Sequence, residues 1–171
     1  ADIASTVYTI SGLSFQPKLV LFFGNYLTAD GSGGGRATAA FGAATSSTAR
    51  GTIVSDSTNN VGTSECDRRY ENTKCIAFLT AGTPTLAAEA DFVQFTSDGF
   101  TINWTTVDAT ARIVNYLAIG GSDITNVKVG QFTTPTGTGN AGVTDPGFKP
   151  DALILFDCVS TSFPTAAGNT T

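Results

Sequence analysis

The sequence predicts an all-β fold, an antiparallel β-sandwich of jelly-roll-like type, on the basis of three observations. Charged residues make up only 13% of the chain and hydrophobic residues 41%, so neutral Thr, Ser, Asn and Gly must supply the polar surface. About nine short runs carry apolar or β-branched residues at strand length, and Gly, Pro, Asn or Asp residues separate them. No stretch shows a convincing helical repeat, so we expect little helix.

The expected strands lie, in chain order, at residues 7–10, 18–24, 36–43, 49–54, 74–79, 90–95, 100–104, 111–119 and 127–132. Within the run at 18–24, residues 19–23 are apolar throughout, which is typical of a strand buried on both faces. Ser97-Asp98-Gly99 separates two strand-like runs and predicts a hairpin. The core is predicted to contain Phe15, Leu19, Leu21, Phe23, Phe92, Phe100, Ile102, Trp104 and Leu117.

An internal repeat is the most informative feature of the chain. Residues 12–23 recur as residues 145–156, and the apolar run keeps its register in both copies. The matched pairs are Phe15 and Phe148, Pro17 and Pro150, and Phe23 and Phe156. Each copy is typical of a Phe-x-Pro turn that starts a buried strand, so the repeat indicates two related β units.

The repeat also sets the expected domain boundaries. A Thr, Gly and Pro-rich stretch at 133–142 has the composition of a linker. We therefore predict a β-sandwich domain at 1–132 and the beginning of a second, incomplete β repeat at 143–171, with more chain expected after Thr171. An isolated strand is not stable in water. The segment 145–156 should accordingly pair with later chain, with the first domain's sheet or with a neighbouring subunit.

Charge and residue content argue against several classes of function. The net charge of −5 disfavours nucleic-acid binding, which depends on clustered Lys and Arg. No run approaches the roughly 20 apolar residues of a membrane span. The chain has no histidine, which excludes Ser-His-Asp and Cys-His catalysis and most metalloenzyme sites. We predict that the protein is not an enzyme and has no catalytic, cofactor or metal site.

Carboxylates and cysteines remain as candidate chemistry. Glu89 and Asp91 lie two residues apart on one strand face and have the residue types of a glycosidase acid–base pair. The interpretation that we favour is two solvent-facing residues that serve solubility. Cys66 and Cys75 lack the spacing and the further ligands of a zinc site. A disulfide between them and two separate buried thiols are both open, as is the state of Cys158.

Two loops carry unusual composition. The segment Gly31-Ser32-Gly33-Gly34-Gly35 lacks the terminal Lys-Ser or Lys-Thr and the following helix of a phosphate-binding loop. It is therefore expected to be a flexible connection between strands. Residues 56–69 form a long polar stretch in which the scarce charges are concentrated. This stretch is either a contact surface for a neighbouring subunit or a solvated loop.

Several segments together resemble a known family. They are GLSFQPK at 12–18 with LFFG at 21–24, NTKC at 72–75, AEADF at 88–92, DGFTINWTT at 98–106, and DATA through YLAIGG at 108–121. The sequence resembles a family of tailed-phage virion structural proteins over most of residues 7–132, and the likeness restarts at Val143. The resemblance implies a component of a virus particle, with other virion proteins as partners, and it does not imply an activity.

Within a virion, two roles are compatible with the sequence. A decoration (cement) protein binds capsid subunits from outside and needs a rigid β module with an adhesive edge or arm. A tail fibre or baseplate module presents loops to a receptor. We favour decoration, with the major capsid protein as partner and a homo-oligomer as the expected state. A secreted carbohydrate-binding β-sandwich is the alternative from a different class, and exposed loop aromatics would distinguish it.

Overall fold

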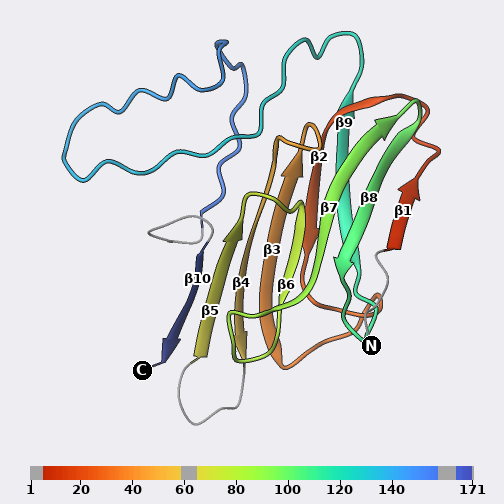
Figure 1. The fold of residues 1–171 in the computed structure, drawn as a ribbon, viewed down its shortest axis with the longest axis vertical. Helices are drawn as coiled ribbons and strands as arrows, with labels where there is room; N and C mark the ends of the chain where they lie inside the picture. Colours follow the sequence, from red (N-terminus) through yellow and green to blue (C-terminus); the bar gives the residue numbers. More distant parts are fainter. Residues whose placement is uncertain (1–5, 59–64, 158–164, 171) are drawn as a thin grey trace.

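A computed structural model describes residues 6–58, 65–157 and 165–170, and these residues form only β-strands and irregular segments (Figure 1). The prediction of an all-β chain with little helix is confirmed for this part of the protein. The strands are β1 (Thr6–Ile10), β2 (Pro17–Gly24), β3 (Arg36–Ala44), β4 (Arg50–Thr58), β5 (Glu65–Glu71), β6 (Ile76–Leu79), β7 (Leu86–Thr96), β8 (Gly99–Thr106), β9 (Val114–Gly120) and β10 (Thr165–Thr170).

These strands form two antiparallel sheets that pack face to face, so the sandwich prediction is confirmed. The described residues give a four-stranded sheet of order β1-β8-β7-β6 and a six-stranded sheet of order β10-β5-β4-β3-β2-β9. Strands β2 to β5 and β6 to β8 follow one another as meanders. This order departs from the Greek-key crossings that the jelly-roll-like part of the prediction implies.

The predicted hairpin is present between β7 and β8. Thr96 pairs with Gly99, and Ser97 and Asp98 form the two-residue turn. The Asp98 main-chain carbonyl also accepts a hydrogen bond from the Leu13 N–H at 2.9 Å. The turn therefore joins the two strands and also contacts the segment that connects β1 to β2.

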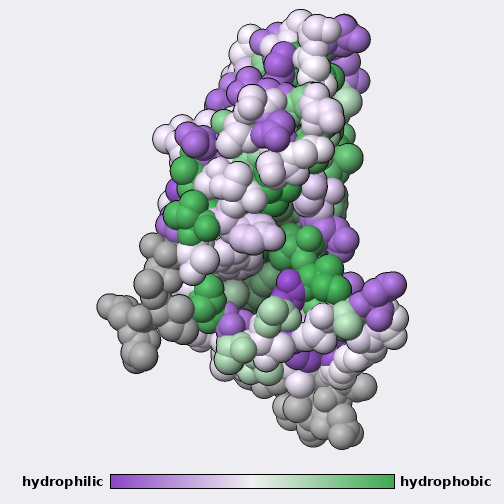
Figure 2. Space-filling view, turned by 90° about the vertical axis from the view of Figure 1, so that its right-hand side faces the viewer, coloured by the Kyte–Doolittle hydropathy of each residue, from purple (hydrophilic) through white to green (hydrophobic). Residues whose placement is uncertain are grey.

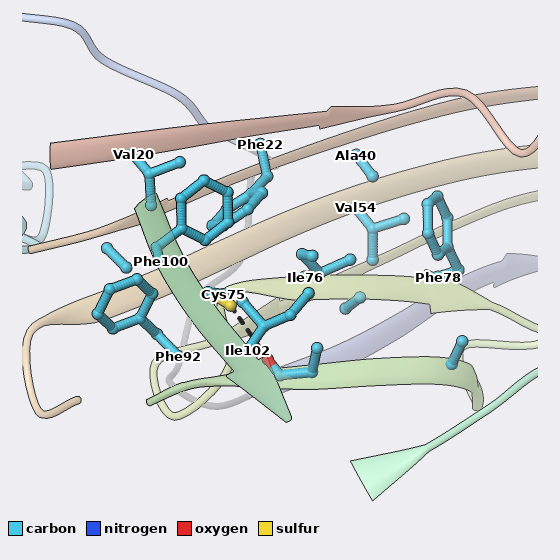
Figure 3. Packing of buried hydrophobic residues seen from close by; sticks show 14 of the residues in the cluster. Val20, Phe22, Ala40, Val54, Cys75, Ile76, Phe78, Phe92, Phe100 and Ile102 are labelled. Atoms are coloured by element: carbon cyan, nitrogen blue, oxygen red, sulfur yellow. Dashed lines mark hydrogen bonds between the residues drawn. The ribbon is translucent and has the colours of Figure 1, made fainter. Parts of the chain in front are cut away.

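The core lies between the two sheets, and Figure 3 shows its packing. In β2 the inward residues are Val20 and Phe22, because they lie opposite Ala44 and Gly42 of β3. The ring of Phe22 packs edge-on against Phe100 of β8 at a centroid distance of 5.6 Å. The buried cluster contains Val20, Phe22, Ala40, Ala44, Val54, Cys75, Ile76, Ala77, Phe78, Leu79, Ala88, Ala90, Phe92, Phe100 and Ile102.

The predicted core is correct for β7 and β8 and wrong for the inward face of β2. Phe92, Phe100 and Ile102 are buried, and Trp104 is half-buried against the cluster. Leu19, Leu21 and Phe23 point to the opposite face of the large sheet, although Leu21 is buried there. Phe15 and Leu117 are exposed. A strand that is apolar on both faces gives no alternation from which its inward face can be read.

Residues 121–157 form a long irregular arm between β9 and the start of the segment that leads to β10 (Figure 1). The strands expected at 127–132 and at 152–156 are not formed, so both predictions are wrong for this structure. The arm contacts the outer face of the large sheet. Lys18 Nζ donates to the Ile124 carbonyl oxygen at 2.5 Å, and the Phe156 ring stacks on Phe41 at 4.8 Å.

Candidate functional site

Charged side chains form a network on the outer face of the four-stranded sheet. Lys74 Nζ lies 3.5 Å from Glu89 Oε1 and 3.3 Å from Asp91 Oδ1. Arg50 Nη2 lies 3.4 Å from the same Asp91 oxygen, and the Thr105 hydroxyl donates to Glu89 at 3.1 Å. Glu89 and Asp91 therefore share one face, as predicted, but they are half-buried and ion-paired rather than solvent-facing. The contacts tie β4, β7, β8 and the segment before β6 together.

A second group of charges lies between the sheets. The carboxylate of Asp56 is 1% exposed and accepts hydrogen bonds from Arg36 Nε at 3.1 Å and Nη2 at 2.6 Å, and from the Thr38 hydroxyl. Arg36 Nη2 also donates to the Leu79 carbonyl oxygen at 3.0 Å. Burial alone would lower the pKa of Arg36, but its hydrogen bond with Asp56 and the charge of that carboxylate outweigh burial and raise this pKa. The pair joins β3, β4 and the end of β6.

The charged stretch at 56–69, predicted to be one polar loop, is divided between two strands. Residues 56–58 end β4, residues 65–69 belong to β5, and residues 59–64 lie outside the described residues. Asp67 lies opposite Asp56 in the β4–β5 pairing, and both are buried. The loop prediction is therefore wrong for most of the stretch. Its two buried carboxylates are not accessible to a neighbouring subunit.

Tyr26 lies at the centre of a cluster that joins the β2–β3 loop to the β8–β9 loop. The guanidinium groups of Arg36 and Arg112 lie 4.1 and 3.7 Å from its ring centroid. Its hydroxyl donates to Asp108 Oδ2 at 2.6 Å, and Arg112 Nη2 lies 3.2 Å from that oxygen. Tyr26 adopts a left-handed φ of 65°, which is uncommon for a bulky residue and needs supporting contacts. The ring is engaged by the protein's own cations.

Asp108 is the carboxylate in this cluster whose pKa the fold changes. Burial alone would raise the pKa of Asp108. Hydrogen bonds from the Tyr26 hydroxyl, the Thr110 N–H at 2.9 Å and Arg112 outweigh burial and lower the pKa below its ordinary value of 3.8. The ionised carboxylate is therefore stabilised by three donors, and it holds the two loops together.

The cysteines do not form the disulfide that the sequence left open. Cys66 and Cys75 are both free; Cys66 is exposed on β5, and Cys75 is buried just before β6. The Cys75 thiol donates to the Ala90 carbonyl oxygen at 3.4 Å (Figure 3). Burial raises the pKa of Cys75 to about 12. The interpretation of two separate thiols is thus correct, but only one of them is buried, and Cys158 lies outside the described residues.

The described residues form neither a phosphate-binding loop nor a metal site. The glycine-rich segment 31–35 is irregular and leads into β3, whereas a phosphate-binding loop leads into a helix. Within residues 6–58, 65–157 and 165–170, no group of three or more His, Cys, Asp and Glu side chains is placed to hold a metal ion. The same residues contain no helix long and apolar enough to cross a membrane.

The arm presents an apolar run to solvent. Leu153, Ile154 and Leu155 are all more than half exposed, and Phe156 is 40% exposed although it stacks on Phe41. Four consecutive apolar residues at the surface are unusual, since exposed hydrophobic residues are ordinarily scattered singly. This run is the second copy of the repeat that forms β2, and it is the surface feature most suited to binding another protein.

No family model, no curated protein and no solved structure matches the chain.

Sequence reasoning missed the buried charges, although a signal for them was present. Ala40, a core residue of β3, has Arg36 four positions before it, and Val54 of β4 has Asp56 two positions after it. Strand side chains alternate between faces, so even spacing places both charged groups on the core face. Their opposite charges indicate a pair. The contact between Tyr26 and Arg112 had no such signal, because it joins two irregular loops.

Proposed function

We propose that the protein is a structural component of a bacteriophage particle, and that within the virion it serves as a capsid decoration protein. The observation that supports this role is the exposed apolar run Leu153 to Phe156 on an arm attached to a β-sandwich. A decoration protein needs a stable module for its body and an extended segment for its grip. The main-chain hydrogen bonds of such a segment bind a partner without charged side chains, which suits a chain with few charged residues.

The described part of the sandwich is built as a stable module. Its two sheets enclose one continuous apolar cluster, and ion pairs such as Arg36–Asp56 close the space between them. The contacts between the arm and this body include the hydrogen bond from Lys18 and the stacking of Phe156 on Phe41. The expected partners are the major capsid protein and further copies of the chain.

We also propose that residues 143–171 open a second β repeat, as the sequence predicts, in which β10 pairs with β5 of the first domain's sheet. Its first strand-like segment, 152–156, is irregular and exposed in this structure. A repeat of this kind buries its apolar run only when further strands join it. In this proposal too, the arm is a segment that buries its apolar side chains only when further strands pair with it.

The direct test is quantitative mass spectrometry of purified particles, with the copy number expressed relative to the major capsid protein. A decoration protein is expected at a fixed ratio to the capsid subunit. A few copies per particle would indicate the tail fibre or baseplate alternative. Absence from purified particles would contradict the proposal in both forms.

A secreted carbohydrate-binding module has less support from the site geometry. Such a module stacks sugars on exposed loop aromatics, and the side chains of Tyr26 and Tyr70 are both engaged by other groups of the protein. Tyr26 has two guanidinium groups against its ring, and the Tyr70 hydroxyl donates to Gln131 of the arm. Tyr70 itself lies on β5 rather than in a loop.

The proposal that the protein is not an enzyme has its own test. Glu89→Gln and Asp91→Asn keep the side-chain shapes and remove the carboxylates that a glycosidase would need. Particle binding is expected to be unchanged in both variants. A glycan-hydrolysing activity of the natural protein that disappears in either variant would overturn the proposal.

A further inference from the structure

The repeated segment exposes the side chains that its first copy buries. Leu153 and Leu155 occupy the positions of Val20 and Phe22 in the repeat. Val20 and Phe22 are 0% and 3% exposed, whereas Leu153 and Leu155 are 70% and 62% exposed. A segment with the pattern of a central strand, and with no strand partner among the described residues, is suited to add to the edge of a sheet.

The sandwich has an open strand position on the side formed by β1 and β9. β8 lies over β9, because the Phe100 ring packs edge-on against Tyr116 at 5.2 Å. β1 continues the four-stranded sheet one strand further, while β9 is the outermost strand at this end of the six-stranded sheet in the described part of the chain. β1 therefore overhangs a place beside β9 that one more strand can occupy.

Apolar side chains border this open position. Tyr8 lies on the inward face of β1, because it is opposite Ile102 of β8, yet it is 58% exposed. Tyr116 and Leu117, on the two faces of β9, are also exposed. Figure 2 looks onto this side of the molecule, where patches of hydrophobic surface lie among hydrophilic and neutral surface.

We propose that residues 152–156 of a second copy of this chain add to β9 as the next strand, beneath β1. Because strand side chains alternate between faces, Leu153 and Leu155 then lie between the sheets against Tyr8 and Tyr116. Ile154 and Phe156 lie on the outer face beside Leu117. Each of these side chains then has the same environment as its counterpart in β2. Leu153 and Leu155 lie between the sheets, as Val20 and Phe22 do, and Ile154 and Phe156 lie on the outer face, as Leu21 and Phe23 do.

The segment of the same chain is poorly placed for this position. Six strand spacings of about 4.8 Å, roughly 29 Å, separate β10 from the open place beside β9. The nine residue steps from Phe156 to Thr165 span at most about 32 Å when fully extended. With β10 paired to β5, self-insertion would need a nearly fully stretched connection across the sheet. A second copy is not limited in this way.

The area available favours reciprocal exchange between two copies. From the exposed fractions of the four donor side chains and of Tyr8, Tyr116 and Leu117, one junction buries about 700 Å² of side-chain surface. Stable interfaces bury roughly 1,200–2,000 Å². One junction falls short of this range, and two junctions reach it. Each copy therefore gives its segment and receives its partner's.

This inference extends the proposed role of the arm by naming its partner, and it is tested on the isolated protein. Failure of self-association would leave the virion proposal intact. Absence of the protein from particles would leave self-association intact.

The test is the mass in solution, measured by sedimentation at increasing protein concentration. The natural chain is expected to form a dimer, twice its 17.5 kDa. The donor variant Leu153→Asp/Leu155→Asp and the acceptor variant Tyr8→Asp are expected to be monomeric. The control Val143→Asp, at an exposed arm position outside the segment, should still form the dimer, and circular dichroism should show that all variants are folded.

A mixture of the two variants distinguishes strand exchange from non-specific hydrophobic association. The acceptor variant retains an intact segment and the donor variant an intact open position, so one junction forms. Because one junction buries less surface than a stable interface, the mixture is expected to form dimers that are weaker than those of the natural chain, at concentrations where each variant alone is monomeric. A natural chain that stays monomeric at all concentrations, a donor variant that still forms dimers, or a mixture as monomeric as its components would each overturn the proposal.

Discussion

Gly42 of β3 lies so close to the main-chain carbonyl of Cys75 that a β-carbon added at Gly42 would be 1.8 Å from that oxygen. The contact brings the large sheet against the segment that leads into β6, at a point where the side chain of Cys75 is itself buried. The packing of the two sheets therefore depends on a residue without a side chain.

Gly42→Ala is expected to destabilise the protein by about 3 kcal/mol, because the main chain of one sheet must move away from the other. Gly51→Ala is the matched control on the neighbouring strand β4. Its added carbon would meet the Tyr70 hydroxyl at 3.3 Å, and the tip of that side chain can move. The control should change the free energy of unfolding by less than about 0.5 kcal/mol. Denaturant unfolding measures both, and equal effects would contradict the packing described.

The buried pair of Arg36 and Asp56 gives a second stability prediction. Asp56→Asn leaves the Arg36 guanidinium buried without a counter-charge, which costs about 3–5 kcal/mol. The control is Asp145→Asn, which breaks the exposed pair with Lys128, whose Nζ lies 3.6 Å from Asp145. Exposed pairs contribute about 0–1 kcal/mol. A loss below about 1 kcal/mol for Asp56→Asn would show that the pair is solvated in solution.

The lowered pKa of Asp108 predicts that the folded protein loses stability in acid. Its folded-state pKa is lower than the 3.8 of an ordinary Asp, so the folded protein binds fewer protons there than the unfolded chain. The stabilising contribution is complete above pH 3.8 and decreases as the pH falls through the lowered pKa. Asp108→Asn removes this part of the pH dependence. The free energy of unfolding, compared between pH 6 and pH 3, should therefore change less in Asp108→Asn than in the natural chain.

The two described cysteines should differ strongly in reactivity. The Cys75 thiol is buried and its pKa is about 12, so it supplies almost no thiolate near pH 8, and the thiolate is the reactive form. Cys66 is exposed. In a Cys158→Ser background, a thiol reagent should modify one residue in the folded protein and two in denaturant. Rapid modification of both residues in the folded protein would contradict the burial of Cys75.

The sequence was sufficient for local features whose signal lies in one stretch of chain. The turn at Ser97 and Asp98 has its residues in order between two alternating runs, and β7 and β8 pair there as predicted. The alternation of Phe100 and Ile102 likewise identified core residues correctly.

The sequence was insufficient where a residue's environment depends on a partner distant along the chain. The inward face of β2 is set by its register with β3, which aligns Phe22 with Gly42, and an evenly apolar strand carries no sign of that choice. The charges of residues such as Asp67 and Arg69 predict a polar loop where the structure has β5. β5 accommodates Arg69 because its Nε donates to Glu71 Oε1 at 2.6 Å and its Nη1 donates to the Pro84 carbonyl oxygen at 3.1 Å.

For the exposed segment 152–156, too, one part of the result could be predicted from the sequence and another could not. The internal repeat identified 152–156 as a segment encoded like a buried strand, and this was visible in the sequence alone. Its exposure, and the open position between β1 and β9, depend on how the two sheets are offset. That offset follows from contacts such as Phe100 with Tyr116, which join residues of different sheets.

Residues 152–156 are expected to become a paired strand on assembly, and amide hydrogen exchange of this segment measures that change. In dilute, monomeric protein its amides should exchange quickly, because the segment is irregular and exposed. At concentrations where the dimer forms, the same amides should be protected, together with those of β9, while amides at 133–142 remain unprotected. Exchange at 152–156 that stays fast when the protein is fully associated would contradict this expectation.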